Sequence, residues 1–318
     1  MPETTNISNL YSKRKFQKTL LLMYKYRYYY LLLLPVIAYF IIFHYIPMYG
    51  VTLAFKDFNM RLGILKSPWA GLSYFQRLFG SNKFWEVCIN TLVISTMKLA
   101  FCFPAPIILA LLINEIRNPK FKKIVQTVSY MPHFISWVVL AGIIIELLSP
   151  SRGAVNYIVT FFGGKPIYFL TEPSMFRWIV VITAMWQSVG WGTIIYLAAI
   201  AGIDITQYEA AYIDGANRFQ VIRRIVLPSI LPVISIVFIL NLGGILNAGF
   251  DQIFNLYNPM VYKTGDIIDT YVYRVGLVDM EYSFSTAVNL FKNVIGLILV
   301  LSTNFVVRRI GDGENALW

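Results

Sequence analysis

Six apolar windows, each long enough to cross a bilayer as a helix, dominate this chain of 318 residues. About twenty helical residues span the hydrocarbon core at 1.5 Å of rise per residue. Backbone polar groups cannot stay unpaired in lipid and barrel strands would alternate in polarity, so the windows predict helices. We expect an all-α integral membrane protein with six transmembrane helices near residues 29–49, 91–113, 128–148, 178–200, 230–250 and 287–307.

The composition excludes an ordinary soluble domain. Charged residues make up 14% of the chain and hydrophobic residues 57%, whereas soluble domains carry about 25% charged residues. The first window is longer than the core of a signal peptide and lacks an A-x-A-like cleavage site, so we expect it to be retained. We expect one transmembrane domain at residues 29–310, a cytoplasmic segment at 1–28 and a cytoplasmic tail at 311–318.

Lys and Arg cluster at alternate ends of the windows, which predicts the orientation. At the opposite ends of the windows, on the other side of the membrane, basic residues are sparser and are interleaved with Asp57 and Glu86. Both termini are therefore expected in the cytoplasm. Anionic lipid headgroups explain the net charge of +11, and we expect no nucleic-acid partner. The clusters lie at residues 13–27, 117–123, 218–224 and 308–309.

The sequence predicts no cofactor on this chain. Cys88 and Cys102 lie about 21 Å apart along one helix, beyond disulfide reach. His44 and His133 have no carboxylate or thiol cluster at ligand spacing, so we expect no metal. Gly163-Gly-Lys-Pro lacks the spacing and the hydroxyl of a phosphate-binding loop.

The segment at residues 204–228, between the fourth and fifth windows, is predicted to form two short cytoplasmic helices. Asp204 is a suitable N-cap for the first helix, and Gly215 fits the left-handed position that ends it. Asn217 can cap the second helix, and Pro228 is expected to end it before the fifth window begins.

The first short helix has features of a docking element. Ile205, Tyr208 and Tyr212 recur at helical spacing, and two adjacent alanines leave a side that another backbone can approach closely. Glu209 adds a carboxylate suited to an Arg on a cytoplasmic partner. The alternative is an amphipathic connector without a partner.

This loop resembles the EAA loop of ABC-importer permeases. The match consists of Glu209-Ala-Ala, Gly215 after three intervening residues, Ile225 and Leu227-Pro228. In that family the loop forms a coupling helix that docks into a cleft of the ATPase subunit. The resemblance implies that coupling to the ATPase depends on Glu209, Ala210, Ala211, Asp214 and Gly215.

Three further stretches resemble carbohydrate-importer permeases: Tyr45-Ile-Pro-Met-Tyr-Gly, Ala54-Phe-Lys-Asp-Phe-Asn and Tyr130-Met-Pro-His-Phe-Ile-Ser-Trp-Val. Nearly the whole chain is similar to the first membrane subunit of maltose-type systems, in the branch for polymer-derived oligosaccharides such as alginate or pectin fragments. The resemblance does not include the extra periplasmic domain and additional N-terminal helices of the maltose protein, so we expect none of its accessory contacts here. The resemblance implies a type I permease fold in a bacterial inner membrane. It also implies a second permease subunit, a cytoplasmic ATPase dimer that holds ATP and Mg, a solute-binding protein and an oligosaccharide.

Amide and aromatic side chains within the windows are candidates for a sugar path, because sugars accept hydrogen bonds at hydroxyls and stack on aromatic faces. They recur at helical spacing on the fourth and fifth windows, and the sixth offers Asn289, Asn293 and Gly296. For each residue alone, packing between helices is the alternative. The candidate path residues are Trp186, Gln187, Trp191, Asn241, Asn247, Asp251, Asn289 and Lys292.

Lys292 is the candidate cation for a uronate carboxylate. Ionisable residues at membrane depth usually face the bundle interior or water. Because Lys292 lies near a helix end, snorkelling to the outer interface is the competing interpretation. Lys98 and Glu146 are similarly ambiguous and can be structural.

Two other classes of function remain open. An ion-coupled secondary sugar transporter would need carboxylates within the helices and interrupted helices in paired halves, which are scarce here. A membrane enzyme would need a catalytic cluster, which Glu146, Asp251 and His133 do not form by spacing. We expect a transport subunit without catalytic residues. Basic outer loops weakly favour an acidic saccharide, although screened surface charge accounts for them equally well.

Overall fold

The computed structural model describes residue 22 and residues 24–310, with side chains placed to residue 305. The predicted cytoplasmic tail and most of the N-terminal segment therefore lie outside the described residues. The described chain is built from helices, which confirms the all-α class. Five helical stretches are long and apolar enough to cross a membrane: Arg27–Phe55, Asn82–Asn114, Pro173–Ala201, Arg218–Gly243 and Tyr282–Phe305.

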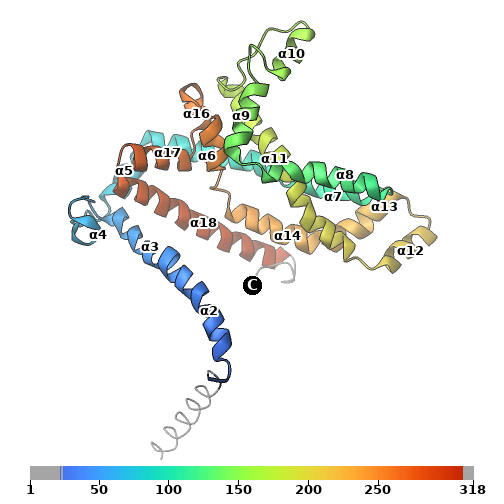
Figure 1. Ribbon diagram of the computed structural model, residues 1–318, viewed down its shortest axis with the longest axis horizontal. Helices are drawn as coiled ribbons and strands as arrows, with labels where there is room; N and C mark the ends of the chain where they lie inside the picture. Colours follow the sequence, from blue (N-terminus) through green and yellow to red (C-terminus); the bar gives the residue numbers. More distant parts are fainter. Residues whose placement is uncertain (1–21, 23, 311–318) are drawn as a thin grey trace, which may run out of the picture.

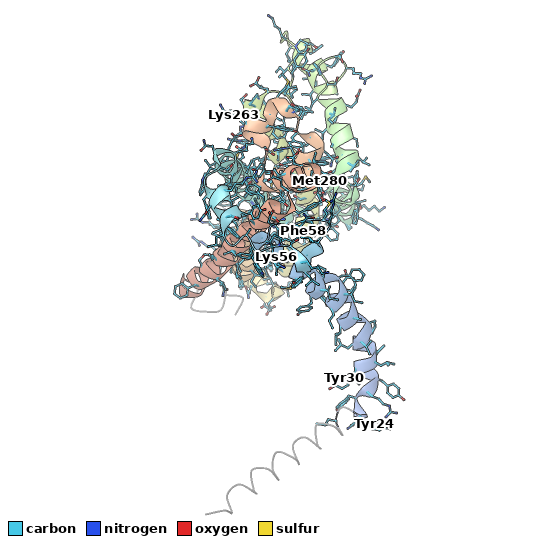
Figure 2. The ribbon with its side chains drawn as sticks, turned by 90° about the vertical axis from the view of Figure 1, so that its left-hand side faces the viewer. Tyr24, Tyr30, Lys56, Phe58, Lys263 and Met280 are labelled. Atoms are coloured by element: carbon cyan, nitrogen blue, oxygen red, sulfur yellow. The ribbon has the colours of Figure 1, made fainter. Side chains whose placement is uncertain are left out.

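Most of the first stretch stands apart from the rest of the molecule, and only its end, at residues 49–55, packs against α18 (Tyr282–Ile310) (Figure 1). It runs through α2 (Arg27–Phe40), the π-helical turn η1 (Ile41–Tyr45), α3 (Ile46–Met48) and the 3-10 helix η2 (Tyr49–Phe55). No residue of α2 is buried. Figure 2 shows Tyr24 and Tyr30 far from Lys56 and Phe58, where this stretch joins the bundle. An apolar helix of this kind needs lipid or another chain against it.

A compact connection follows the first stretch and holds α4 (Gly63–Lys66) and α5 (Ser73–Phe79). Lys56 is buried, and its Nζ donates hydrogen bonds to the carbonyl oxygens of Ile64 and Leu65 at 2.8 and 3.1 Å. The Ser283 hydroxyl accepts from the amide of Phe58 and donates to the carbonyl of Lys56. These bonds tie the connection to α18 (Tyr282–Ile310).

The centre of the bundle is α11 (Pro173–Ala201), which packs against α6 (Asn82–Cys102) and α7 (Pro104–Asn114). The Ser81 hydroxyl caps α6 by accepting from the amide of Phe84. A buried cluster that includes Ile94, Phe176 and Val180 joins α6 to α11. Close packing of such side chains fixes how the long helices cross.

The third apolar window is not one straight helix, which corrects the sequence-based expectation. It is divided into α8 (Pro119–Tyr130), the 3-10 turn η3 (Met131–Phe134) and α9 (Trp137–Leu147), and the chain bends by 104° at the break. Pro132 lies in the turn and has no amide hydrogen to continue an α-helical ladder. The short helix α10 (Ala154–Phe161) projects beyond α9 (Figure 1).

The fifth window was also predicted too long. Its helix, α14 (Leu227–Gly243), stops seven residues before the predicted end at residue 250 and is followed by a turn that reaches Gly249. Gly249 has φ +97°, a left-handed conformation that favours glycine. The chain then enters α15 (Phe250–Leu256), the 3-10 turn η5 (Pro259–Val261), α16 (Tyr262–Gly265), α17 (Ile268–Tyr273) and the π-helical turn η6 (Arg274–Val278).

A buried polar network holds α16 and α17 against α6 and α11. The carboxylate of Asp266 is completely buried and pairs with Arg274 at 2.6 Å and with Lys83 at 3.6 Å. Asn90 donates to the backbone carbonyl of Asp266, and Arg177 donates to the Asn90 side-chain oxygen. These bonds close the end of the bundle that carries α5 and α17, opposite the end that carries α12 (Ile205–Ile213) (Figure 1).

Candidate functional site

The loop at residues 204–217 forms the predicted short helix with its predicted caps. The Asp204 carboxylate accepts from the amide of Thr206 at 3.0 Å, and this backbone hydrogen bond lowers the pKa of Asp204. Gly215 has φ +75°, and the amide of Ala216 donates to the carbonyl of Ala211, which closes the C-terminus of α12. Asn217 and Gln220 exchange hydrogen bonds as a capping box.

The second short helix does not end at Pro228, contrary to the sequence-based prediction. From α13 (Arg218–Val221) the chain continues through the π-helical turn η4 (Ile222–Val226) directly into α14. Pro228 follows this π-helical turn, whose altered hydrogen-bond pattern accommodates a residue without an amide hydrogen. Residues 218–243 therefore form one continuous helical stretch, which joins α13 to the transmembrane helix α14 without a break.

The two faces of α12 have different environments. Tyr208 and Ala211 pack on a buried cluster of α11 and α14 residues that includes Tyr196 and Ile230, and burial raises the pKa of Tyr208. The opposite face, which starts at Ile205 and continues at i+4, i+7 and i+8, is exposed. The sequence pattern had grouped Tyr208 with Ile205 and Tyr212, and the structure separates them. The exposed face consists of Ile205, Glu209, Tyr212 and Ile213.

An ion pair between α13 and the end of α7 is a second connection that positions the loop. Arg218, the first residue of α13, pairs with Glu115 at the C-terminus of α7 across 3.5 Å. Such a partly exposed pair contributes little to stability, but it joins the loop to a second long helix. Four of the five predicted coupling residues are exposed: Glu209, Ala210, Asp214 and Gly215. The fifth, Ala211, is partly buried.

A cavity of about 670 Å³ opens between four of the long helices, a volume in the usual range for ligand sites. Its walls are formed by α6, α7, α11 and α14 and by the turn after α14. Polar side chains from three helices and from the turn after α14 converge on it among mainly apolar neighbours. These polar residues are Ser95, Lys98, Ser188, Asn241 and Asn247, and aromatic walls come from Phe103, Trp191 and Tyr196.

Three of the predicted path residues line this cavity: Trp191, Asn241 and Asn247. The Trp191 indole stacks on the ring of His133, with centroids 4.5 Å apart and planes 4° from parallel. Asn241 donates to the carbonyl of Val237, one turn earlier, and keeps its side-chain oxygen for other donors. An aromatic wall with two amides matches the chemistry expected of a sugar path.

The other five predicted path residues lie outside the cavity. Trp186 is half-exposed, and the Gln187 amide approaches only the carbonyl of His133, at 3.5 Å. Asp251 and Asn289 are exposed. Lys292 is buried in an ion pair with Asp269 of α17, so it neither snorkels nor faces the cavity.

Lys98 and Ser95 line the cavity but were not among the predicted path residues. The Lys98 ammonium donates to the carbonyl of Ala248 and to Oε1 of Gln252, both at 2.6 Å. The sequence did carry a signal, because Ser95, Lys98 and Cys102 recur at i, i+3 and i+7 on one face of α6. The two acceptors of Lys98 come from 150 and 154 residues further along the chain, which no local pattern indicates.

Comparison with known proteins identifies the family. A family model described as the binding-protein-dependent transport system inner membrane component matches residues 103–312. The chain is 43% identical over 280 residues to protein LplB of Bacillus subtilis (strain 168), covering 88% of each chain. It is 43% identical over 303 residues to the polygalacturonan/rhamnogalacturonan transport system permease protein YteP of the same organism, covering 95% of this chain and 94% of the relative.

Solved structures agree with these sequence relatives. A bacterial ABC transporter involved in the import of the acidic polysaccharide alginate superimposes with a TM-score of 0.87 at 42% identity, covering 92% of this chain and 99% of that chain. The bacterial alginate ABC transporter in complex with alginate pentasaccharide-bound periplasmic protein gives a TM-score of 0.84 at 43% identity, covering 91% and 96%. The predicted type I permease fold and transport role are confirmed. The chain belongs to the binding-protein-dependent inner membrane components and is a membrane-spanning permease subunit of an ABC importer.

Proposed function

We propose that this chain forms one wall of the path for an acidic oligosaccharide and transmits ATP-driven movement to that path through α12. The observation that carries the proposal is a mechanical connection. α12 carries Glu209 on its exposed face, and the turn at residues 214–217 joins it to the continuous helical stretch Arg218–Gly243, whose Asn241 lines the cavity. A displacement of the loop therefore changes the cavity.

The chemistry of the exposed face favours a protein partner. Ile205, Tyr212 and Ile213 are 68%, 54% and 85% exposed, a costly arrangement for a helix that faces water alone. Glu209 beside them supplies a carboxylate for a charge-assisted hydrogen bond from an Arg of the partner. We assign this face to a cytoplasmic ATPase subunit, one of a dimer that binds ATP and Mg, while this chain binds no nucleotide.

The substrate class follows from the relatives and from the cavity. YteP is named for polygalacturonan and rhamnogalacturonan, and the two structural neighbours handle alginate. The charged residue in the lining of this cavity is Lys98, and a cation suits a uronate. We infer that a solute-binding protein delivers acidic oligosaccharides, and that a second permease subunit completes the path.

The test is stimulation of ATP hydrolysis in the reconstituted complex of both permeases, the ATPase and the binding protein. Glu209→Ala is expected to lower saccharide-stimulated ATPase activity about tenfold to a hundredfold, the range for losing a charge-assisted hydrogen bond. Asp279→Ala is the matched control, because Asp279 is an exposed carboxylate before α18 at the other end of the bundle. If both variants keep full stimulation, α12 is not the coupling element.

A further inference from the structure

Lys98 is a cation within a membrane-spanning stretch, Asn82–Asn114, and the part of the chain that the structure describes places no carboxylate in the cavity beside it. Ionisable residues at such depth normally pair with an opposite charge, as Lys292 does with Asp269. Among the described residues, no Asp or Glu lines the cavity and no salt bridge includes Lys98. Its charge is therefore compensated only by neutral oxygen atoms.

The surroundings hold the Lys98 ammonium in place. Gln252 is buried and donates its amide hydrogens to the carbonyl of Val180 at 2.7 Å and to the hydroxyl of Thr183 at 2.8 Å. Its oxygen is thereby directed at Lys98. Gly249 gives the ammonium room, because a Cβ at that position would lie 2.8 Å from Nζ. Two of the three ammonium hydrogens are used by Gln252 and Ala248, and one remains.

Ser95 lies one helical turn before Lys98 and also lines the cavity. Its hydroxyl oxygen is buried and has no hydrogen-bond partner within the described part of the chain. Buried hydroxyls without a partner are unfavourable and call for an explanation. Here a held ammonium and an unpaired hydroxyl, three residues apart on α6, both border the same cavity.

We propose that Lys98 and Ser95 form a carboxylate-binding subsite that recognises a uronate unit of the passing saccharide. The proposal rests on the proposed function, since it assigns the acidic preference of the path to two residues. The ammonium supplies charge and one hydrogen bond, and the hydroxyl donates a second. Trp191 and Asn241, on other walls of the cavity, are left to contact the rest of the sugar.

The test compares uptake of a uronate oligosaccharide with uptake of its methyl ester, which has the same shape without the charge. The binding protein is identical in every sample, so its own preference cancels when the acid-to-ester ratio of a variant is divided by that of the wild type. Lys98→Met is expected to lower this ratio tenfold to a hundredfold. Lys98→Gln keeps a donor without the charge and is expected to lower it similarly.

Ser95→Ala tests the subsite independently, because it removes only an oxygen that has no partner and should not impair folding. It is expected to lower the acid-to-ester ratio by up to about tenfold. If Lys98→Met depresses both saccharides equally and Ser95→Ala leaves the ratio unchanged, Lys98 merely braces Ala248 and Gln252, and the subsite is overturned. If the wild type takes up neither saccharide, the proposed function itself fails.

Discussion

Gly190 lies where α11 crosses α8, and the structure predicts the consequence of filling that crossing. A Cβ at residue 190 would lie 2.0 Å from the carbonyl oxygen of Ser129, 2.3 Å from its carbonyl carbon and 2.8 Å from the amide nitrogen of Tyr130. Ordinary contacts begin at 3.4 Å. All three obstacles are backbone atoms, so no side chain can rotate away, and the two helices must move apart.

Gly190→Ala is therefore expected to destabilise the protein by about 3 kcal/mol, the upper end of the range for overpacking a core. We expect the Tm of the purified complex in detergent to fall by about 5–10 °C. The neighbouring Trp191 lines the cavity and stacks on His133 just after α8. Separation of the helices should thus also weaken saccharide-stimulated ATP hydrolysis.

Gly142→Ala on α9 is the matched control, because a Cβ there meets nothing within 4 Å. Alanine is the better helix former, so this variant should be neutral or stabilised by about 0.5–1 kcal/mol. A Gly190→Ala protein with the Tm of the wild type would show that α11 and α8 do not cross as closely as described.

Two further substitutions test other parts of the account. Gly215→Ala places a Cβ in a left-handed conformation, φ +75°, and should cost about 1 kcal/mol. Because the strain lies in the loop, the amount of saccharide taken up per ATP hydrolysed should be reduced by a larger fraction than the Tm. Reductions of equal fraction in both quantities would refute this expectation. Asp266→Asn leaves Arg274 and Lys83 without their carboxylate, and since the Arg274 side chain is only 26% exposed, we expect a loss of about 2–3 kcal/mol in chemical unfolding. Glu86→Gln, which weakens an exposed pair with Lys83, should cost less than 1 kcal/mol.

Local chemistry made much of the fold predictable from the sequence. The length of the apolar windows predicted the long helices. The capping side chains of Asp204 and Asn217 bond to backbone within three residues, and Gly215 acts through its own left-handed backbone, so all three roles are local. The errors came from proline and glycine in apolar surroundings. Hydropathy treats residues 128–148 as continuous, whereas the bend between Phe134 and Trp137 depends on where α8 and α9 pack. Pro228 shows the converse, because a π-helical turn before it lets the helix continue.

The cavity was only partly predictable, for a different physical reason. Amide and aromatic types pointed to Trp191, Asn241 and Asn247, but helical spacing cannot say which face of a helix meets the cavity. Lys292 and Lys98 look alike in sequence, each a lysine within an apolar helix. What separates them is a carboxylate 23 residues from Lys292, and only neutral oxygens beside Lys98.

The most direct test of the central claim is uptake of a radiolabelled uronate oligosaccharide into proteoliposomes that contain the complete complex. The account predicts accumulation only when ATP is present on the side of the ATPase and the binding protein is present on the other side. It also predicts that Glu209→Ala abolishes or strongly reduces this accumulation. Uptake without ATP that follows an imposed proton or sodium gradient, and that is indifferent to Glu209→Ala, would contradict the account and favour an ion-coupled secondary transporter.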